Sequence, residues 1–240
     1  DDAWDSLNLL ETRSTGIKVA VIDTGVDANH EDLVGVINTT DSGFVEGNEV
    51  ITGVTDSDGH GTHVCGIIAA EYGPGTDEYP VGGVGVASVS ASNDTVDIIA
   101  IDAYDEVEEA FFSNDIAVAI YYARQKDAQL INMSLTGPGE DLTVELQIEA
   151  AYYNNNILCI CAAGNEHTDA MRSPSDVEET ISVMASSGTE TAGSGSIDHR
   201  YSNYGYEKDI LAPGTGIWST ILYEDGRYAS WSGTSMAAPV

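Results

Sequence analysis

Three short motifs contain residue types that could act together in nucleophilic catalysis. VIDTG at 21–25 places the carboxylate of Asp23 directly after an apolar run. HGTHV at 60–64 places the imidazole of His60 at the start of a helical pattern, and GTSMAAP at 233–239 does the same for the hydroxyl of Ser235. A serine hydroxyl needs a neighbouring base to become a nucleophile, and histidine is the usual one near neutral pH. A carboxylate, an imidazole and a hydroxyl are therefore a candidate catalytic set.

Each motif taken alone is a weak signal. An acidic residue after a strand is often an ordinary turn, and a single histidine more often has a structural role. Zinc binding by His60 and His63 is conceivable at a spacing of three residues, but the HExxH arrangement is absent. All three motifs together, in the order Asp, His and Ser, form a strong signal.

A fourth motif, AAGNE at 162–166, adds Asn165. With these four motifs in order, the chain resembles the subtilase family of serine peptidases from about Trp4 to Val240. The resemblance implies a three-layer α/β fold with a mostly parallel central sheet and helices on both faces. It also implies a single subtilisin-like peptidase domain over residues 1–240, with the C-terminal part of the family domain missing.

The resemblance assigns a role to each motif residue. Ser235 is expected to be the nucleophile, His60 the base, and Asp23 the group that orients the imidazole, with Thr24 beside it. The side-chain amide of Asn165 is expected to form the oxyanion hole with the backbone N–H of Ser235. Two alternatives stay open, an inert peptide-binding module and a relative that passes the acyl group to an amine.

Substrate binding is expected by resemblance along one extended segment and one pocket wall. The residues are Ser134, Leu135, Thr136 and Gly137 on the segment, and Ala163 and Gly164 on the wall. Thr136 adds bulk where relatives commonly have glycine. Glu166 would favour a cationic residue before the scissile bond and Arg172 an acidic one, and the sequence leaves this choice open.

No cofactor is expected for catalysis, but the family often binds structural calcium. Asp32 is a tentative calcium ligand, and Asp77 and Glu78 could add ligands from the loop at 73–85. A propeptide, a monomeric state, secretion and a protein or peptide substrate are further expectations from the resemblance.

Composition excludes some partners. The 240 residues include 40 Asp and Glu but only 8 Lys and Arg, a net charge of −32. Such a chain would repel nucleic acids and anionic lipids, so neither is expected as a partner. No apolar run reaches the roughly 20 residues that span a bilayer. The acidity is compatible with a solvated surface, with high salt or with local calcium binding.

The elements that must position these residues follow an alternating pattern. Short apolar runs predict strands buried on both faces, and amphipathic stretches between them predict helices, which favours parallel βαβ units. The predicted strands are 17–22, 96–101, 129–134, 157–162 and 180–184, and the predicted helices are 61–72, 114–125 and 142–153. Cys65, Cys159 and Cys161 are expected to be small buried hydrophobes rather than disulfide partners.

Overall fold

The computed structural model describes residues 16–71, 96–187 and 196–240, and its core is an eight-stranded sheet. The strands lie in the order β12-β11-β9-β7-β1-β4-β2-β3, and every pair is parallel except β2 with β3. Their bounds are β1 Ile17–Asp23, β2 Gly43–Glu46, β3 Glu49–Thr52, β4 Val96–Asp102, β7 Leu130–Met133, β9 Leu158–Ala162, β11 Thr180–Ser186 and β12 Ile210–Pro213.

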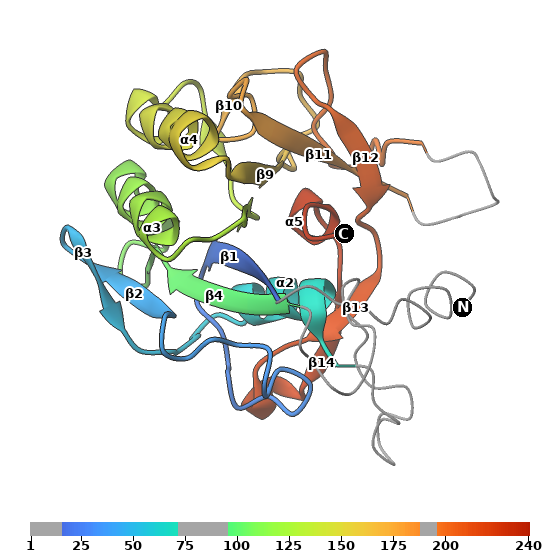
Figure 1. The fold of residues 1–240 in the computed structure, drawn as a ribbon. Coiled ribbons are helices and arrows are strands. Elements are labelled where there is room, and N and C mark those ends of the chain that lie inside the picture. The colour runs from blue at the N-terminus through green and yellow to red at the C-terminus, as the bar shows by residue number, and fades with distance from the viewer. Residues whose placement is uncertain (1–15, 72–95, 188–195) are drawn as a thin grey trace, which may run out of the picture.

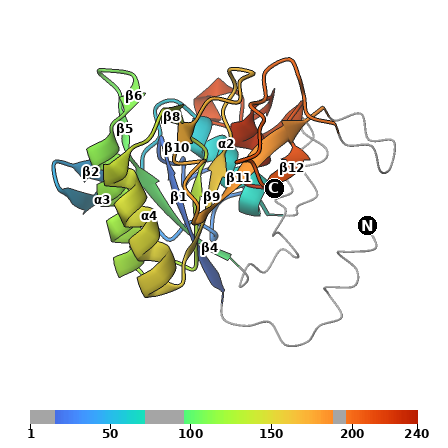
Figure 2. The same ribbon diagram turned by 90° about the horizontal axis from the view of Figure 1, so that it is seen from above.

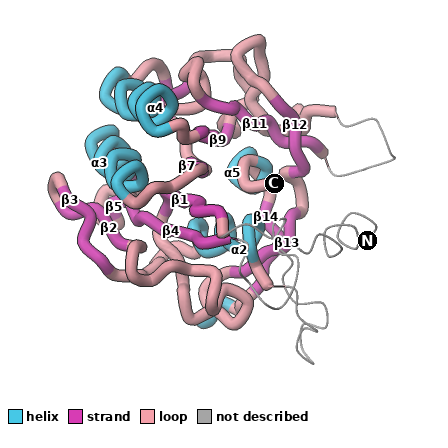
Figure 3. Tube along the Cα trace, viewed as in Figure 1, coloured by secondary structure: helices cyan, strands magenta, loops and turns pink. Residues whose placement is uncertain are grey.

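Helices cover both faces of this sheet, as Figures 1 and 3 show. Helices α3 (Ser113–Gln125) and α4 (Leu142–Asn155) lie on one face, and α2 (His60–Ala69) and α5 (Thr234–Ala237) lie on the other. The view from above in Figure 2 shows the same separation, with α3 and α4 stacked side by side. The expected three-layer α/β fold is confirmed.

Strand β1 shows why its sequence produces this layering. Side chains alternate along a strand, so one set of apolar residues faces each helical layer. Ala20 and Ile22 belong to the core cluster under α3 and α4, whereas Val19 and Val21 belong to the cluster under α2. A strand that is apolar on both faces can only be stable between two layers, which explains its uninterrupted apolar run.

The predicted central elements are all present, with shifts of a few residues at their ends. The sequence analysis missed the elements with little apolar periodicity. These are the edge hairpin β2–β3, strand β12 and the short elements β5 (Tyr104–Asp105), β6 (Ala110–Phe111), β8 (Gly137–Pro138), β10 (Arg172–Ser173), β13 (Ile217–Thr220), η1 (Tyr223–Asp225) and β14 (Tyr228–Trp231). The whole loop at 73–85 lies outside the described residues, as do residues 188–195.

All three cysteines are buried and free, as the sequence analysis predicted. Burial raises the pKa of each thiol, so these side chains behave as small apolar groups. Within the described part of the chain, no helix has the length and apolar character needed to cross a membrane.

Candidate active site

Asp23 is the last residue of β1, at the carboxyl end of the strand where the sheet order changes direction. After β1, the chain forms β2, β3 and β4 on one side of β1. It then crosses to β7 on the other side. Ligands of open α/β sheets bind at such a switch point. The Asp23 side chain is buried, and its Oδ1 accepts a hydrogen bond from the backbone N–H of Thr24 at 2.9 Å.

His60 begins helix α2 directly over this carboxylate. Its Nδ1 lies 2.6 Å from Oδ1 of Asp23, a short hydrogen bond between the two side chains. The close approach of their two motifs requires glycine, because a Cβ on Gly61 would lie 2.1 Å from the carbonyl oxygen of Gly25. The hydroxyl of Thr24 accepts from the N–H of Gly61 at 2.9 Å, which ties the helix start to the strand end.

The surroundings of His60 raise its pKa above the usual value for histidine. Burial alone would lower this pKa, but the charge and hydrogen bond of Asp23 act in the opposite direction, and Asp58 and Asp56 add to them. The imidazole therefore binds a proton more tightly than a free one does. An imidazole whose protonated form is stabilised in this way is suited to accept a proton from a neighbouring group.

His63 lies one helical turn further along α2 and differs from His60 in its surroundings. Its ring stacks on Trp231 with centroids 4.6 Å apart, and its Nε2 lies 3.2 Å from the carbonyl oxygen of Ala229. Burial lowers its pKa to about 4, so it is neutral at physiological pH. The structure supports the expected structural role of His63. No cluster of three or more His, Cys, Asp or Glu side chains suited to a metal occurs among the described residues.

Ser235 lies in the first turn of α5 and lines the same open cleft as His60, which has a volume of about 340 Å³. Its Oγ donates a hydrogen bond to the carbonyl oxygen of Ser134 at 3.0 Å. In the part of the chain that the structure describes, Ser235 and His60 share no hydrogen bond. The hydroxyl must turn from Ser134 toward His60 before the imidazole can accept its proton.

Asn165 follows the carboxyl end of β9 and lines the same cleft. Its Oδ1 accepts hydrogen bonds from the backbone N–H of Thr234 at 2.9 Å and from the Thr234 hydroxyl at 3.1 Å. Because the N–H can only donate, these bonds fix which end of the amide is the oxygen. The Nδ2 donor is thereby left available to a group bound in the cleft.

The residues expected to bind substrate lie around this cleft. Ser134, Leu135 and Thr136 line it, although Leu135 is largely buried. Gly137 instead pairs with Ser173 in the small antiparallel sheet of β8 and β10. From the other expected segment, Ala162, Asn165 and Glu166 line the cleft, whereas the buried Ala163 and Gly164 are not among the lining residues. The φ of +100° at Gly164 suits glycine.

The structure brings Glu166 and Arg172 together, a pairing that the sequence analysis did not foresee. Their Oε2 and Nη2 atoms are 3.0 Å apart. The same Glu166 oxygen accepts a hydrogen bond from Nδ2 of Asn203 at 2.8 Å, and Asn203 is fully buried. Asn203 lies far along the chain in a loop without a distinctive motif, so no sequence signal indicated it.

The expected calcium ligand Asp32 has a different partner in the structure. Its Oδ2 accepts a hydrogen bond from the hydroxyl of Tyr228 at 2.7 Å. Asp77 and Glu78 lie outside the described residues. Asp32 does not belong to any group of three or more His, Cys, Asp or Glu side chains that could hold a metal among the described residues. Calcium binding stays a prediction.

Comparison with known proteins decides the family. The model of the subtilase family matches residues 14–240. The chain belongs to the subtilase family. It is 38% identical over 238 residues to the intracellular serine protease of Paenibacillus polymyxa, covering 95% of this chain and 65% of that protein. It is also 38% identical over 240 residues to the thermophilic serine proteinase of Bacillus sp. (strain AK1), covering 100% of this chain and 52% of that protein.

A solved structure supports the same assignment. The S41 psychrophilic protease aligns with a TM-score of 0.75 and 30% sequence identity, over 94% of this subtilase chain and 74% of that one. The chain thus spans between about half and three quarters of the lengths of these relatives.

The expectation of a secreted protein was wrong. It rested on treating secretion as a property of the whole family. The relative from Paenibacillus polymyxa is named an intracellular serine protease, and a 32% identical relative from Bacillus subtilis (strain 168) is named the major intracellular serine protease. Membership of the subtilase family therefore does not indicate secretion.

Proposed function

We propose that this protein is a serine endopeptidase that hydrolyses peptide bonds through an acyl-enzyme, within a single subtilisin-like domain. The observation that carries the proposal is the 2.6 Å hydrogen bond between Asp23 and His60, at the edge of a cleft that also contains Ser235 and Asn165. The relatives named serine protease and serine proteinase support the same reaction.

In the first step, the Ser235 hydroxyl turns from the Ser134 carbonyl to Nε2 of His60 and gives up its proton as Oγ attacks the substrate carbonyl carbon. The carboxylate of Asp23 holds Nδ1–H and stabilises the imidazolium that forms. The raised pKa of His60 reflects this stabilisation. His60 then donates the proton to the departing amine, which leaves the acyl group on Ser235.

Negative charge develops on the substrate carbonyl oxygen during this attack. Two donors are available for it, Nδ2 of Asn165 and the backbone N–H of Ser235 in the first turn of α5. The first N–H groups of a helix have no acceptor within the helix. Fixed donors of this kind stabilise the transition state because they need little reorganisation when the charge forms. A water molecule, activated by His60, completes hydrolysis in the second half of the reaction.

We infer that the substrate binds as an extended strand along Ser134–Thr136. The carbonyl oxygen of Ser134 faces the cleft, where it already accepts the Ser235 hydroxyl. A substrate N–H would compete for this oxygen. Strand addition recognises mainly the peptide backbone, which suits an enzyme that acts on protein or peptide chains.

The proposal is tested by intact-mass spectrometry before and after treatment with a fluorophosphonate probe, with Ser235→Ala as the matched control. We expect one probe adduct on the unmodified protein and none on the variant, together with hydrolysis of a peptide amide. Absence of labelling on the folded protein would favour the inert binding module. Adding an amine during hydrolysis checks the acyl-transfer alternative, since a transferase would give mainly the amide product.

A further inference from the structure

A narrow slot lies between Thr136 and Gly164, beside the cleft that Thr136 and Glu166 line. We propose that Thr136 and the Glu166–Arg172 ion pair close this slot, so that the residue before the scissile bond must be small and uncharged, as in glycine, alanine or serine. The inference rests on the proposed function, because it identifies the slot as the position of that residue's side chain.

Thr136 closes the slot from one side. A methyl group built on Gly164 would lie 3.1 Å from Cγ2 of Thr136. Carbon atoms in favourable contact are about 3.5–4.0 Å apart, so another carbon does not fit between the two segments. The Thr136 hydroxyl donates to the carbonyl oxygen of Ser173 at 3.4 Å, and threonine is stiff about its first side-chain torsion.

Glu166 closes the slot on a second side. Its Oε2 would lie 2.9 Å from the same methyl group on Gly164. This oxygen is held by Arg172 at 3.0 Å and by Asn203 at 2.8 Å. Nδ2 of Asn203 also donates to the carbonyl oxygen of Ala163 at 2.9 Å. Although 48% of the Glu166 side chain is exposed, its Oε2 is thus bound by two donors, one of them the buried amide of Asn203.

The ion pair also bears on whether the substrate residue before the scissile bond carries a positive or a negative charge, which the sequence left open. The Arg172 side chain is only 13% exposed, and its Nε is buried without a partner among the described residues. A cationic substrate side chain would have to compete for Glu166 Oε2 with Arg172 and Asn203, and displacing the largely buried Arg172 would leave its charge unpaired. An acidic side chain would meet the Glu166 carboxylate. Neither charge is favoured.

The test is a series of peptide amides that differ only in the residue before the scissile bond, namely Ala, Ser, Leu, Phe, Lys and Glu. We expect kcat/KM to be at least about 10-fold higher for Ala than for Phe. Thr136→Gly should raise kcat/KM for Phe about 10–100-fold relative to Ala. Thr136→Val retains the bulk but loses the hydroxyl, so it should retain the preference for small residues. Arg172→Met should increase cleavage after Lys relative to Ala.

Equal cleavage after Phe and Ala by the unmodified protein would overturn the inference, as would an unchanged ratio in a folded Thr136→Gly variant. Binding of the same peptides to Ser235→Ala separates the slot from the chemistry. If the unmodified protein hydrolyses nothing but Ser235→Ala binds the Ala peptide more tightly than the Phe peptide, the slot is confirmed and the proposed function fails. If Ser235→Ala binds the Phe peptide as tightly, or binds neither peptide, the slot inference fails.

Discussion

Ser134 and Ser235 exchange two hydrogen bonds, each hydroxyl donating to the other residue's backbone carbonyl. Oγ of Ser235 lies 3.0 Å from the oxygen of Ser134, and Oγ of Ser134 lies 2.9 Å from the oxygen of Ser235. Nδ2 of the buried Asn132 donates to the Ser134 hydroxyl at 3.0 Å. This series of hydrogen bonds connects the start of α5 to the end of β7. Under the proposed function, a substrate N–H that takes the Ser134 carbonyl releases the Ser235 hydroxyl toward His60.

The pH dependence of hydrolysis should reveal the pairing of Asp23 with His60. The base must be neutral to accept a proton, and its pKa is raised, so kcat/KM should rise with pH and reach half its maximum above pH 6.5. Asp23→Asn removes a charge that raises this pKa, so the half-maximum should move to lower pH. The same change should lower kcat about 10⁴-fold because the imidazole tautomer is no longer fixed.

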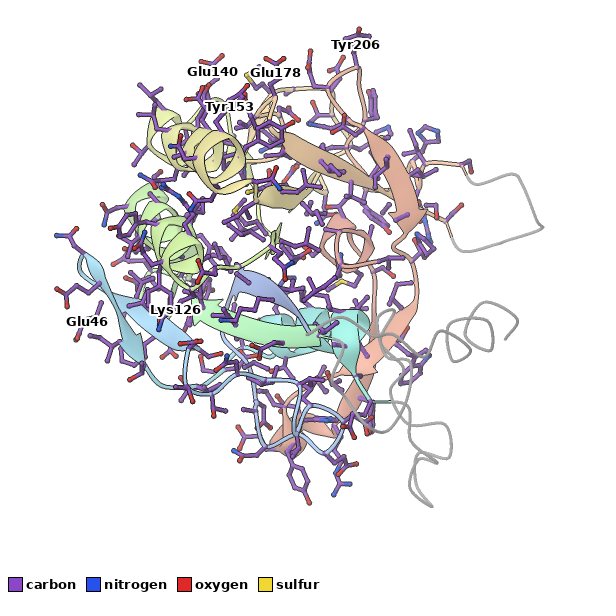
Figure 4. All side chains as sticks on the ribbon, in the orientation of Figure 1. Glu46, Lys126, Glu140, Tyr153, Glu178 and Tyr206 are labelled. Carbon is purple, nitrogen blue, oxygen red and sulfur yellow. The ribbon has the colours of Figure 1, made fainter. Side chains whose placement is uncertain are left out.

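Initial rates of peptide amide hydrolysis between pH 5 and 9 check this prediction. Glu46→Gln serves as the control, because Glu46 lies at the turn of the β2–β3 hairpin, projects from the outer surface in Figure 4 and does not line the cleft. A half-maximum that stays at the same pH in Asp23→Asn would show that another group titrates.

Asn165→Ala should lower kcat about 10²–10³-fold and leave KM nearly unchanged, because the lost donor acts mainly on the charge of the transition state. Thr234→Val removes one of two hydrogen bonds that orient the Asn165 amide, so its effect should be smaller, about 2–10-fold. Steady-state kinetics on one peptide amide measures both. An equal loss in kcat and gain in KM for Asn165→Ala would contradict a role in the oxyanion hole.

Asp102 should make the protein less stable as the pH rises. Asp102 of β4 lies opposite Asp23 of β1 in the sheet. Burial raises the pKa of Asp102 to about 6, and the negative charges of Asp56, Glu106 and Asp23 raise it further. The folded state then binds this proton more tightly than the unfolded state, so its contribution to stability is present below about pH 4 and lost as the pH rises through 6.

Asp102→Asn removes the group whose ionisation lowers stability, and its amide oxygen can still accept the hydrogen bond from the N–H of Tyr104. We expect the variant to be about 1–2 kcal/mol more stable than the unmodified protein at pH 8 and no more stable at pH 4. Urea unfolding at the two pH values measures the difference. A gain that is equal at both would point to packing and not to the titration of Asp102.

The net charge of −32 should make stability depend on salt. Screening reduces repulsion among exposed carboxylates such as Glu46, Glu140 and Glu178, which project from the outer surface in Figure 4. Raising KCl from 0.1 to 2 M should stabilise the protein by at least about 1 kcal/mol, or about 2–4 °C in the unfolding midpoint. A triple variant with Gln at these positions should respond less. A midpoint that does not rise with KCl would exclude adaptation to high salt.

The sequence predicted the parts of the structure that depend on local pattern. The apolar run at 17–22 indicated β1, and glycines around His60 and Ser235 indicated exposed turns at helix starts. It could not predict the contacts that depend on distant residues. The pairing of Glu166 with Arg172 and Asn203, and the distance from Thr136 to Gly164, arise only when separate loops pack together. Strands β12–β14 were missed because each has only four residues.

The positions of Asp23, His60 and Ser235 along the chain determine when the site can exist during synthesis. Asp23 and His60 lie in β1 and α2, which are made early, whereas Ser235 lies in α5, which packs against the core of α2 only after the whole sheet has been made. A growing chain thus contains Asp23 and His60 before Ser235 has been added. The candidate site therefore arises late, from contacts between distant parts of the sequence.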